Sequence, residues 1–474
     1  MQKLTSNYLF VIMYHFITVS TPIFTTPYIS RVLGPKNIGI DAYVNSIVQV
    51  FMVFIVLSIG VYGRKQIASA QSKKEIQTEF CSIYSVQFMM TFIVLSTYVF
   101  YIFQINNYHN LFWMYGITLI ATGLDVAWYF IGLEKVKQIM IRNTAIRLLT
   151  IVSIFIFVRN QEDLWKFVLI SSLSLLFGQF ITWIILLKEI KQIRLSFLGI
   201  KQHIRPILIL SIIPCLSLIY MSINKIILGH VSGSTAVGFY NQAYKLIIIC
   251  MGFINALSIV MMPRMVNHYT RGEKEEFKEK LIFSIKYTCI TTLPIMVMII
   301  ILANDLIPIF FGSSFSSVSN VLMTLAPGLV FAGLSEIFGV QILLTVGKEK
   351  HYAVSVMIGA IISLSTNYLL VNGLHSIGTA IAFDVGILTT LLVQVYSSRK
   401  FISLTILLNS LLRYSLLSVC SGAAVIFIGN FLVNYSESLI IGFKLIIAIT
   451  TYVTFLLISK DKIIWRLIYQ IVRK

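Results

Sequence analysis

The sequence predicts an all-α integral membrane protein with about fourteen transmembrane helices, and three observations lead to this fold class. First, 57% of the 474 residues are apolar and 12% are charged, whereas soluble domains carry roughly a quarter charged residues. A chain of this composition cannot cover a core with a polar surface and needs lipid as its solvent. Second, apolar stretches long enough to span a bilayer follow one another along the chain. Third, basic residues are concentrated in every second connection.

The apolar stretches define the individual helices, since a membrane-spanning helix takes roughly 20 apolar residues. We predict helices over 7–29, 38–63, 80–103, 110–130, 144–158, 165–187, 207–228, 238–262, 281–302, 319–346, 351–371, 377–396, 409–433 and 439–459. The first stretch is too long for the apolar part of a signal peptide and lacks a small-residue cleavage pattern, so we expect it to remain as the first helix. The longest connection, 188–206, leaves no room for a soluble catalytic domain.

The basic residues predict the orientation, because cytoplasmic connections of membrane proteins are enriched in Lys and Arg. With the N-terminus in the cytoplasm, 28 of the 37 basic residues fall on the cytoplasmic side, at Lys3 and within 64–74, 135–147, 188–205, 264–280, 348–350, 399–400 and 460–474. The opposite connections hold Arg31, Lys36 and Arg159 and little else. We therefore expect both termini in the cytoplasm.

The two halves of the sequence resemble each other. Three features recur in the same order with six helices between partners: Leu33-Gly34 and Ile38-Gly39 against Leu228-Gly229 and Val237-Gly238; the charged stretches after Arg64 and Arg264; and Gly132-Leu133-Glu134-Lys135 against Gly347-Lys348-Glu349-Lys350. Parallel repeats of this kind are typical of transporters, with the substrate site between the halves. Chance similarity among apolar helices is the alternative interpretation.

The repeat predicts the domain organisation. We expect an N-terminal lobe of six helices over 1–190, a basic cytoplasmic linker over 191–206, and a C-terminal lobe of six helices over 207–400. The remainder, 401–474, holds the last two helices and a basic cytoplasmic tail.

Polar side chains inside the predicted helices are candidate site residues, since such groups are costly in lipid. In the eighth helix, Asn241 and Lys245 begin a stripe that continues through Ile248, Gly252 and Asn255 at helical spacing. In the second helix, Asp41, Asn45 and Gln49 form a similar stripe. We expect the two stripes to face each other across a central cavity; separate helix–helix hydrogen bonds are the alternative.

Further charged residues extend the candidate site. Lys225 and Arg31, near the outer ends of the seventh and first helices, either complete a cationic patch or anchor the helices at the interface. A lumen lined by Lys and Arg attracts phosphate or carboxylate groups. The acids Asp125, Glu336 and Asp384 either carry a coupled proton or ion, or act as counter-ions for lysines such as Lys245.

Other classes of protein are disfavoured. The net charge of +19 would suggest nucleic acid in a soluble protein, but here the basic residues follow the membrane topology. Gly347-Lys348 is followed by Glu349, so no phosphate-binding loop of the P-loop type is present. The five cysteines form no CxxC pair and are interpreted as buried thiols, and the seven histidines show no metal-like spacing. We expect no metal, no cofactor, no nucleic acid and no catalytic residues.

Several segments together resemble a known family. They are Pro27 to Gly34; Ile131 to Lys135; Gly229 with Gly238 to Lys245; Met262-Pro263-Arg264; Phe310 to Phe315; and Gln341, Leu344 and Gly347-Lys348. In their order they resemble the Wzx-type flippases for lipid-linked polysaccharide repeat units, in the multidrug/oligosaccharidyl-lipid/polysaccharide exporter superfamily. The resemblance extends to about Lys400 and is weaker in the last two helices.

The resemblance implies a V-shaped pair of lobes around a central cavity lined by the first two helices of each half. Such proteins move undecaprenyl-pyrophosphate-linked oligosaccharides from the cytoplasmic to the outer leaflet of the membrane, for capsule or O-antigen assembly. Arg31, Lys225 and Lys245 would then attract the pyrophosphate or acidic sugars, beside Asn45 and Asn241. Arg64 and Arg264 would meet them at the cytoplasmic mouth. The energy coupling stays open.

Two rival functions remain. A drug or cation antiporter of the same superfamily would favour an acidic cavity and twelve helices. A membrane-embedded polysaccharide polymerase or ligase would need a catalytic constellation, usually on a long outer loop, and none is visible in the sequence. A separate polymerase is a candidate partner of the transporter, beside membrane lipid.

Overall fold

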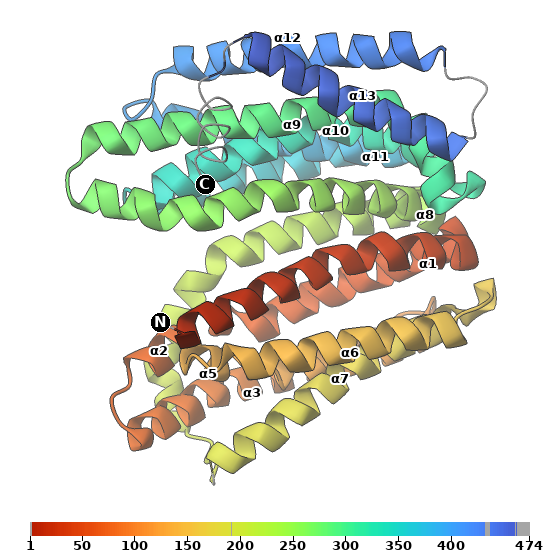
Figure 1. Cartoon of the computed structure of the whole chain (residues 1–474). Helices are drawn as coiled ribbons and strands as arrows, with labels where there is room; N and C mark the ends of the chain where they lie inside the picture. The colour runs from red at the N-terminus through yellow and green to blue at the C-terminus, as the bar shows by residue number, and fades with distance from the viewer. Residues whose placement is uncertain (1, 191, 432–436, 460, 462–474) are drawn as a thin grey trace. The chain divides into compact units, whose positions relative to one another are not determined.

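The computed structural model describes residues 2–190, 192–431, 437–459 and 461, with the side chains of 2–20, 197, 198, 253, 255, 256, 259, 437 and 438 not described. The side chain of Asn255 and the basic tail over 462–474 therefore lie outside the described residues. Within this part of the chain, the regular elements are helices and no strand occurs (Figure 1). The chain divides into two compact units, Met1–Gly229 and His230–Lys474.

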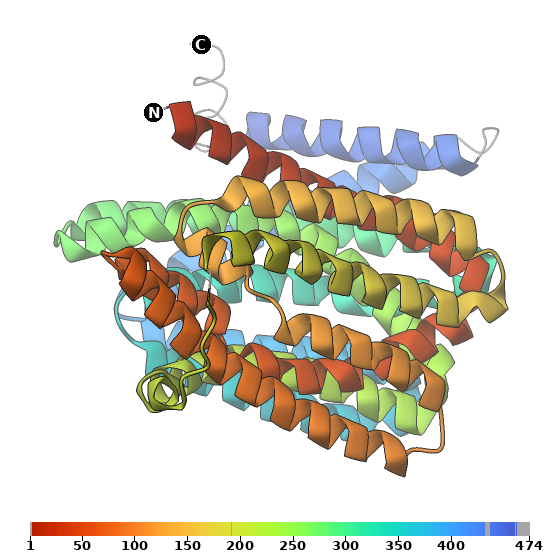
Figure 2. The ribbon, with the colours of Figure 1, turned by 90° about the horizontal axis from the view of Figure 1, so that it is seen from below.

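The first unit is built from the helices up to the start of α8. These are α1 (Gln2–Val56), α2 (Ile59–Ser69), α3 (Lys73–Gln104), α4 (His109–Gly123), α5 (Ala127–Gly132), α6 (Val136–Phe157), the short η1 (Gln161–Asp163), α7 (Leu164–Glu189) and the beginning of α8 (Phe197–Thr270). α6 and α7 lie side by side in two perpendicular views (Figure 1 and Figure 2).

The second unit holds the rest of α8 and the helices that follow it. These are α9 (Lys274–Phe311), the short η2 (Ser313–Phe315), α10 (Val318–Ser335), the π-helical segment η3 (Glu336–Leu344), α11 (Glu349–Ser398), α12 (Leu404–Gly429) and α13 (Glu437–Ile458). α13 packs on α9, where Lys444 Nζ lies 2.6 Å from Asp305 Oδ2 and the Tyr452 hydroxyl donates to the Ile290 carbonyl at 3.1 Å.

The described residues contain eleven helical stretches that are long and apolar enough to cross a membrane. Three of them, Thr21–Ser69, Gly199–Gly252 and Glu349–Ser398, have 49, 54 and 50 residues. Each is about twice the length of one crossing and contains a break in the helix, at Gly34, Gly233 and His375. Counting these three as double crossings gives fourteen, which is compatible with the predicted number.

The same break occurs in the leading helix pair of each half of the sequence, in α1 and in α8. Gly34 has φ 73° and ψ 170°, and Gly233 has φ 80° and ψ 172°. The sequence comparison aligned Gly34 with Gly229, whereas the backbone conformation aligns it with Gly233. In this alignment Gly39 still corresponds to Gly238, because each lies five residues after its break.

Close to each break, a hydrogen bond joins the helix to a later helix connection or helix break of the same unit. The Asn37 side chain donates to the Gln161 carbonyl at 2.7 Å, in the connection between α6 and α7. Ala236, three residues after Gly233 as Asn37 is after Gly34, accepts from the Ser376 hydroxyl at 2.9 Å, next to the break in α11. The contact recurs although the side chains differ, which supports two structural repeats.

The helix ends also repeat. Glu134 (φ 57°) ends the α4–α5 segment and Gly347 (φ 73°) ends η3. After each, the next backbone N–H reaches back to a carbonyl five residues earlier, Lys135 to Phe130 at 2.9 Å and Lys348 to Leu343 at 2.8 Å, the bond of a Schellman cap. The fold is thus an all-α membrane fold with two pseudo-symmetric six-helix halves followed by two further helices.

The structure extends one predicted helix and corrects one interpretation. The fifth helix, predicted over 144–158 and expected to borrow residues from its basic N-terminal flank, begins at Val136 as α6. Basic and polar residues lower the hydropathy of its first two turns. Cys81 and Cys289 are buried, but Cys420 on α12 is exposed, so the interpretation of all five cysteines as buried thiols was wrong.

Each unit has its own core. In the first, aromatic rings from α3, α5 and α7 stack around Phe80, whose centroid lies 5.4 Å from that of Trp128 and 5.2 Å from that of Tyr129. In the second, apolar side chains of α8 to α13 pack around Leu281, Ile285 and Phe338. Large apolar side chains also cover the outside, such as Phe427 at 67% and Phe92 at 68% exposure, as expected for helices that face lipid.

Candidate functional site

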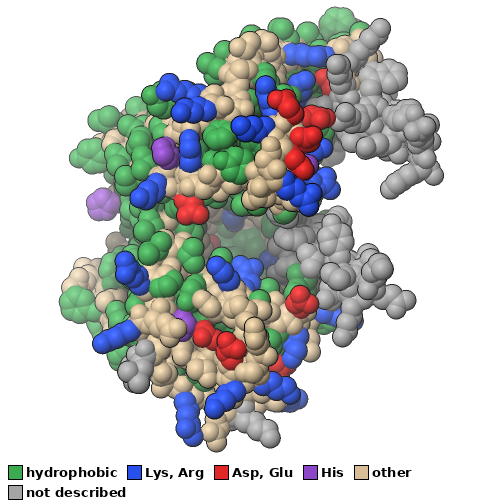
Figure 3. Space-filling view, turned by 90° about the vertical axis from the view of Figure 1, so that its left-hand side faces the viewer, with side chains coloured by type: hydrophobic (Ala, Val, Ile, Leu, Met, Phe, Trp, Pro, Cys, Tyr) green, Lys and Arg blue, Asp and Glu red, His purple; other side chains and the backbone are tan. Residues whose placement is uncertain are grey.

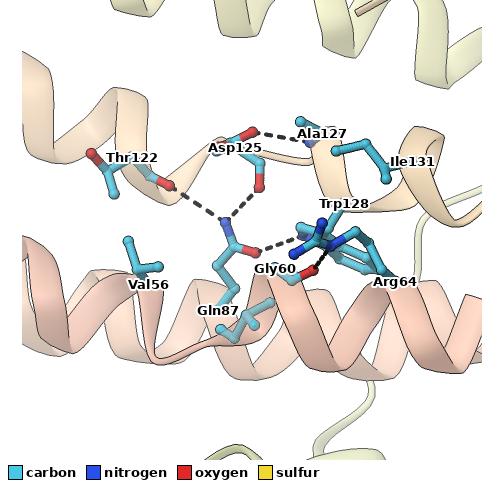
Figure 4. A pocket seen from close by; sticks show the side chains of 10 residues that line it. Val56, Gly60, Arg64, Gln87, Thr122, Asp125, Ala127, Trp128 and Ile131 are labelled. Atoms are coloured by element: carbon cyan, nitrogen blue, oxygen red, sulfur yellow. Dashed lines mark hydrogen bonds between the residues drawn. The ribbon is translucent and has the colours of Figure 1, made fainter. Parts of the chain in front are cut away.

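A pocket of about 230 Å³ opens in the first unit where two helices are interrupted (Figure 4). One wall comes from the junction of α1 and α2, the other from the junction of α4 and α5. Residues from α3 form its floor. The lining residues are Val56, Ile59, Gly60, Arg64, Gln87, Thr122, Asp125, Ala127, Trp128 and Ile131. Interrupted helices of this kind commonly line binding sites in membrane transporters.

The interruptions have local causes. Leu57 and Ser58 adopt left-handed backbone angles (φ 36° and 53°) and separate α1 from α2. α2 then packs closely on α5 through Gly63, where a Cβ atom would lie 2.5 Å from the indole ring of Trp128. Only a residue without a side chain allows this approach, so Gly63 sets the distance between the two walls of the pocket.

Gln87 on α3 holds the open α4–α5 junction in place (Figure 4). Its amide nitrogen donates to the carbonyls of Asp125 at 2.9 Å, Gly123 at 3.1 Å and Thr122 at 3.4 Å. Its amide oxygen accepts from the indole N–H of Trp128 at 3.2 Å. With 4% exposure, Gln87 replaces the helical hydrogen bonds that this junction lacks, which is required for irregular backbone at membrane depth.

Arg64 and Asp125 bring opposite charges to the pocket from opposite walls (Figure 4). Arg64 Nε donates to the Gly60 carbonyl at 2.6 Å, and Asp125 Oδ1 accepts from the backbone N–H of Ala127 at 3.0 Å. Within the described part of the chain, the two side chains form no ion pair with each other. The guanidinium can therefore bind a phosphate or carboxylate oxygen while the carboxylate accepts from a hydroxyl group.

A second polar region of the first unit lies between the α1–α2 segment and the beginning of α8. The Tyr62 hydroxyl is 2.9 Å from His203 Nδ1, Ser58 donates to the Leu210 carbonyl at 3.3 Å, and Ser222 donates to Gln49 at 3.5 Å. Residue numbers rise on α1 as they fall on α8, so the helices are antiparallel. One further turn in this register puts Lys225 level with Asn45.

Asp41, the first residue of the predicted α1 stripe, contacts the interior of its own unit. Its Oδ1 accepts from the hydroxyl of Tyr115 on α4 at 2.6 Å. Gln49 at the other end of the stripe contacts α8, as described above. The hydrogen bonds of this stripe therefore include contacts within the first unit, and its role in a cavity between the lobes stays a prediction.

The other predicted site residues are distributed along both units. Arg31 is exposed just before the Gly34 break, and Arg264 is exposed near the end of α8. Asn241 is buried and Lys245 half-buried in α8 beyond the Gly233 break. Within the first unit, Arg64 and Asp125 line one pocket, and the helical register extrapolated from the Ser222–Gln49 contact puts Asn45 level with Lys225.

The two remaining acids belong to the second unit. Glu336 is the first residue of the π-helical segment η3. Asp384 on α11 packs against Gly328 of α10, where a Cβ atom would lie 2.2 Å from its Oδ1, and this buried oxygen has no hydrogen-bond partner. Among the side chains that the structure describes, no cluster of His, Cys, Asp and Glu is suited to a metal ion.

The sequence interpretation did not single out Gln87 and Trp128, although its polar stripes included the uncharged side chains of Asn45 and Gln49. Gln87 is an uncharged polar side chain in the middle of a predicted helix, and that alone marks it, since it needs partners in lipid. Figure 3 shows Lys and Arg side chains (blue) on the surface of the described residues.

The fold and the paired helix breaks define a two-lobed, multi-pass membrane transporter. A family model described as polysaccharide biosynthesis protein matches residues 4–268, which is 265 of the 474 residues. The chain belongs to this polysaccharide biosynthesis protein family.

Relatives in the family are named as glycan transporters. The chain is 25% identical over 368 residues to the putative O-antigen transporter of Escherichia coli K12, covering 76% of this chain and 88% of that protein. It is 21% identical over 234 residues to the probable low-salt glycan biosynthesis flippase Agl15 of Haloferax volcanii, covering 49% of this chain and 46% of that protein.

Solved structures share the fold. The lipid II flippase MurJ in an inward closed conformation has a TM-score of 0.74 at 17% identity and covers 96% of this chain and 100% of that one. An inward-facing multidrug resistance transporter of the MATE family has a TM-score of 0.62 at 14% identity and covers 85% of this chain and 94% of that one.

Proposed function

We propose that this protein flips undecaprenyl-pyrophosphate-linked oligosaccharide repeat units across the bacterial cytoplasmic membrane, for capsule or other surface polysaccharide assembly. The observation that carries the proposal is the match to a putative O-antigen transporter over 88% of that protein's length, on a two-lobed transporter fold. The mechanism is alternating access without covalent chemistry. The headgroup and sugars cross along polar side chains, while the polyprenyl tail stays in lipid.

The orientation follows from the basic connections. With the basic ends of the helices in the cytoplasm, both termini are cytoplasmic. The first lobe is 1–190, the linker 191–206 and the second lobe 207–400, with 401–474 as the appended helices and tail. A separate polysaccharide polymerase is the expected consumer of the flipped product.

The cationic side chains take successive roles along the route. Arg64 and Arg264, near the basic ends of α2 and α8, meet the pyrophosphate on entry. Lys225 and Lys245, with Asn45 and Asn241 beside them, hold it during passage, and Arg31 lies near the exit. Asp125, Glu336 and Asp384 serve as counter-ions or as carriers of a coupled ion.

Lys245 provides the direct test. We expect Lys245→Ala to lower transport at least about tenfold, because a charge-assisted hydrogen bond to the cargo is lost, and Lys245→Arg to retain most of it. The measurement is surface polysaccharide and accumulated lipid-linked intermediates in a deletion strain that carries each variant at equal membrane abundance.

The matched control is Lys166→Ala, because Lys166 is the third residue of α7 and reaches the headgroups from the end of that helix. Its transport should equal that of the unsubstituted protein. Normal transport by Lys245→Ala would remove Lys245 from the proposed route. Absence of lipid-linked intermediates in the deletion strain would contradict the proposed function itself.

A further inference from the structure

Arg147 lies in the middle of a membrane-spanning helix. α6 runs from Val136 to Phe157 over 22 residues, and Arg147 is eleven residues from its start, or about 16 Å at 1.5 Å per residue. That depth is close to the centre of a hydrocarbon core of about 30 Å. The sequence had counted Arg147 among the basic flank of the fifth helix, so the earlier start of α6 changes its environment from headgroups to membrane interior.

The side chain of Arg147 is on the face of α6 that points away from lipid. The exposed face carries large apolar residues: Ile141 (51%), Leu148 (52%), Leu149 (66%), Val152 (54%), Phe155 (40%) and Ile156 (48%). At 3.6 residues per turn, Arg147 lies opposite the centre of that face, together with Asn143, Thr150 and the buried Ile154. Reaching along the apolar face to lipid headgroups therefore does not explain this arginine.

Among the described residues, Arg147 has no ion-pair partner and its Nη1 has no hydrogen-bond partner, in contrast to Arg142 on the same helix. Arg142 Nη1 donates to the Gly178 carbonyl at 2.8 Å, and its Nε donates to Asn143 Oδ1 at 3.0 Å. Arg147 Nη1 is buried without a hydrogen-bond partner, and Arg147 forms no ion pair with any residue that the structure describes. On the adjacent α7, Gln179 Oε1 is likewise buried without a partner.

An unpaired guanidinium in the membrane interior is costly and is typically functional. Its planar donors match the oxygens of a phosphate or carboxylate in a two-pronged contact. We propose that Arg147 binds the anionic group of the transported molecule halfway across the membrane, so that the cargo supplies the counter-charge that the protein omits. The inference rests on the proposed function and adds a binding position between the entry at Arg64 and the exit near Arg31.

The first experiment measures binding to the purified full-length protein by thermal shift. Arg147→Gln removes an unpaired charge, so its midpoint without ligand should equal or exceed that of the unsubstituted protein. The control, Arg142→Gln, should unfold at a lower temperature, because it breaks the bond to the Gly178 carbonyl. These two results distinguish a binding arginine from a structural one.

The ligand arms use undecaprenyl pyrophosphate, undecaprenol and glucuronic acid as probes. Undecaprenyl pyrophosphate should raise the midpoint of the unsubstituted protein, with an affinity at least about tenfold weaker for Arg147→Gln. Undecaprenol should act equally on both proteins. A selective effect of glucuronic acid would assign the site to an acidic sugar, and equal responses of both proteins to all three probes would overturn the proposal.

Flipping in proteoliposomes separates this inference from the proposed function. With a fluorescent undecaprenyl-pyrophosphate-linked disaccharide, Arg147→Gln should flip at least about tenfold more slowly than the unsubstituted protein, and Arg147→Lys should fall between them. Equal rates for the unsubstituted protein and Arg147→Gln would overturn the role of Arg147 alone. No flipping by the unsubstituted protein would overturn the proposed function, whereas the binding difference would still support an anion site at Arg147.

Discussion

Replacing Gln87 by Leu is expected to destabilise the first unit by about 3 kcal/mol, which corresponds to a midpoint about 6–12 °C lower for a unit of this size. The change leaves the indole N–H of Trp128 and the carbonyls of Gly123 and Asp125 without their partner in a buried place. Each such group costs about 1–3 kcal/mol, and the gain from a buried leucine offsets only part of the sum. The measurement is thermal unfolding of purified protein in detergent.

The matched control makes the same substitution in the other unit. Gln394 on α11 is fully buried. Among the described residues, its side chain accepts one hydrogen bond, from the Ser335 hydroxyl at 2.8 Å, and its amide nitrogen has no partner. Gln394→Leu should therefore cost about 1 kcal/mol or less. Equal losses for the two variants would contradict the special role of Gln87 at the α4–α5 junction.

The pocket gives Gln87→Leu a functional consequence as well. Gln87 binds the backbone carbonyl of Asp125, and the same junction places the Asp125 carboxylate across from Arg64. If the junction relaxes, the two charges no longer keep their separation. Transport should then fall by more than the loss of folded protein accounts for, when activity is expressed per folded molecule.

The fold could be predicted from the sequence because its main determinants are local. Apolar length defines each crossing, and basic residues mark alternate ends of the helices. The start of α6 could not be read in this way, since Lys137, Arg142 and Asn143 lower the hydropathy of its first turns although they are helical. Arg142 is tolerated there because it finds the Gly178 carbonyl on α7, a tertiary contact that no local pattern shows.

The candidate site was only partly readable. Arg64 and Asp125 were each identified as charged residues near or within a helix, but in different helices and different roles. Their shared pocket depends on the close packing of Gly63 against Trp128, which joins α2 to α5. Side-chain chemistry can be assigned from sequence, whereas the distance between helices depends on the small residues between them.

In the internal repeat, too, the alignment of residue identities differs from the alignment of backbone conformations. The match of Leu-Gly pairs aligned Gly34 with Gly229, whereas the backbone break of α8 that corresponds to Gly34 is at Gly233. What the two halves share is a conformation that glycine alone adopts easily, at the same distance before Gly39 and Gly238. The requirement for a positive φ therefore aligns the two halves more accurately than the identities of adjacent residues.

The requirement for a positive φ predicts a second large loss of stability, on substitution of the glycines at the two helix breaks. Gly34→Ala and Gly233→Ala should each destabilise the protein by about 1–3 kcal/mol, and the double variant by about the sum, because a φ near 75° with a ψ near 170° is essentially restricted to glycine. The new methyl groups have room: the closest atom to a Cβ at Gly34 is Gln161 Nε2 at 3.5 Å, and no atom lies within 4 Å of one at Gly233. The expected loss therefore measures backbone strain without a clash.

Gly442→Ala is the matched control, since Gly442 lies within the regular helix α13 and a Cβ atom there would also meet nothing within 4 Å. That change should leave the unfolding midpoint unchanged or raise it slightly, because alanine is preferred to glycine within a helix by about 0.5–1 kcal/mol. If Gly34→Ala and Gly233→Ala unfold like Gly442→Ala, the two helices are not broken at these residues in the folded protein. If both lose stability equally and the losses add, the two units hold the same break independently.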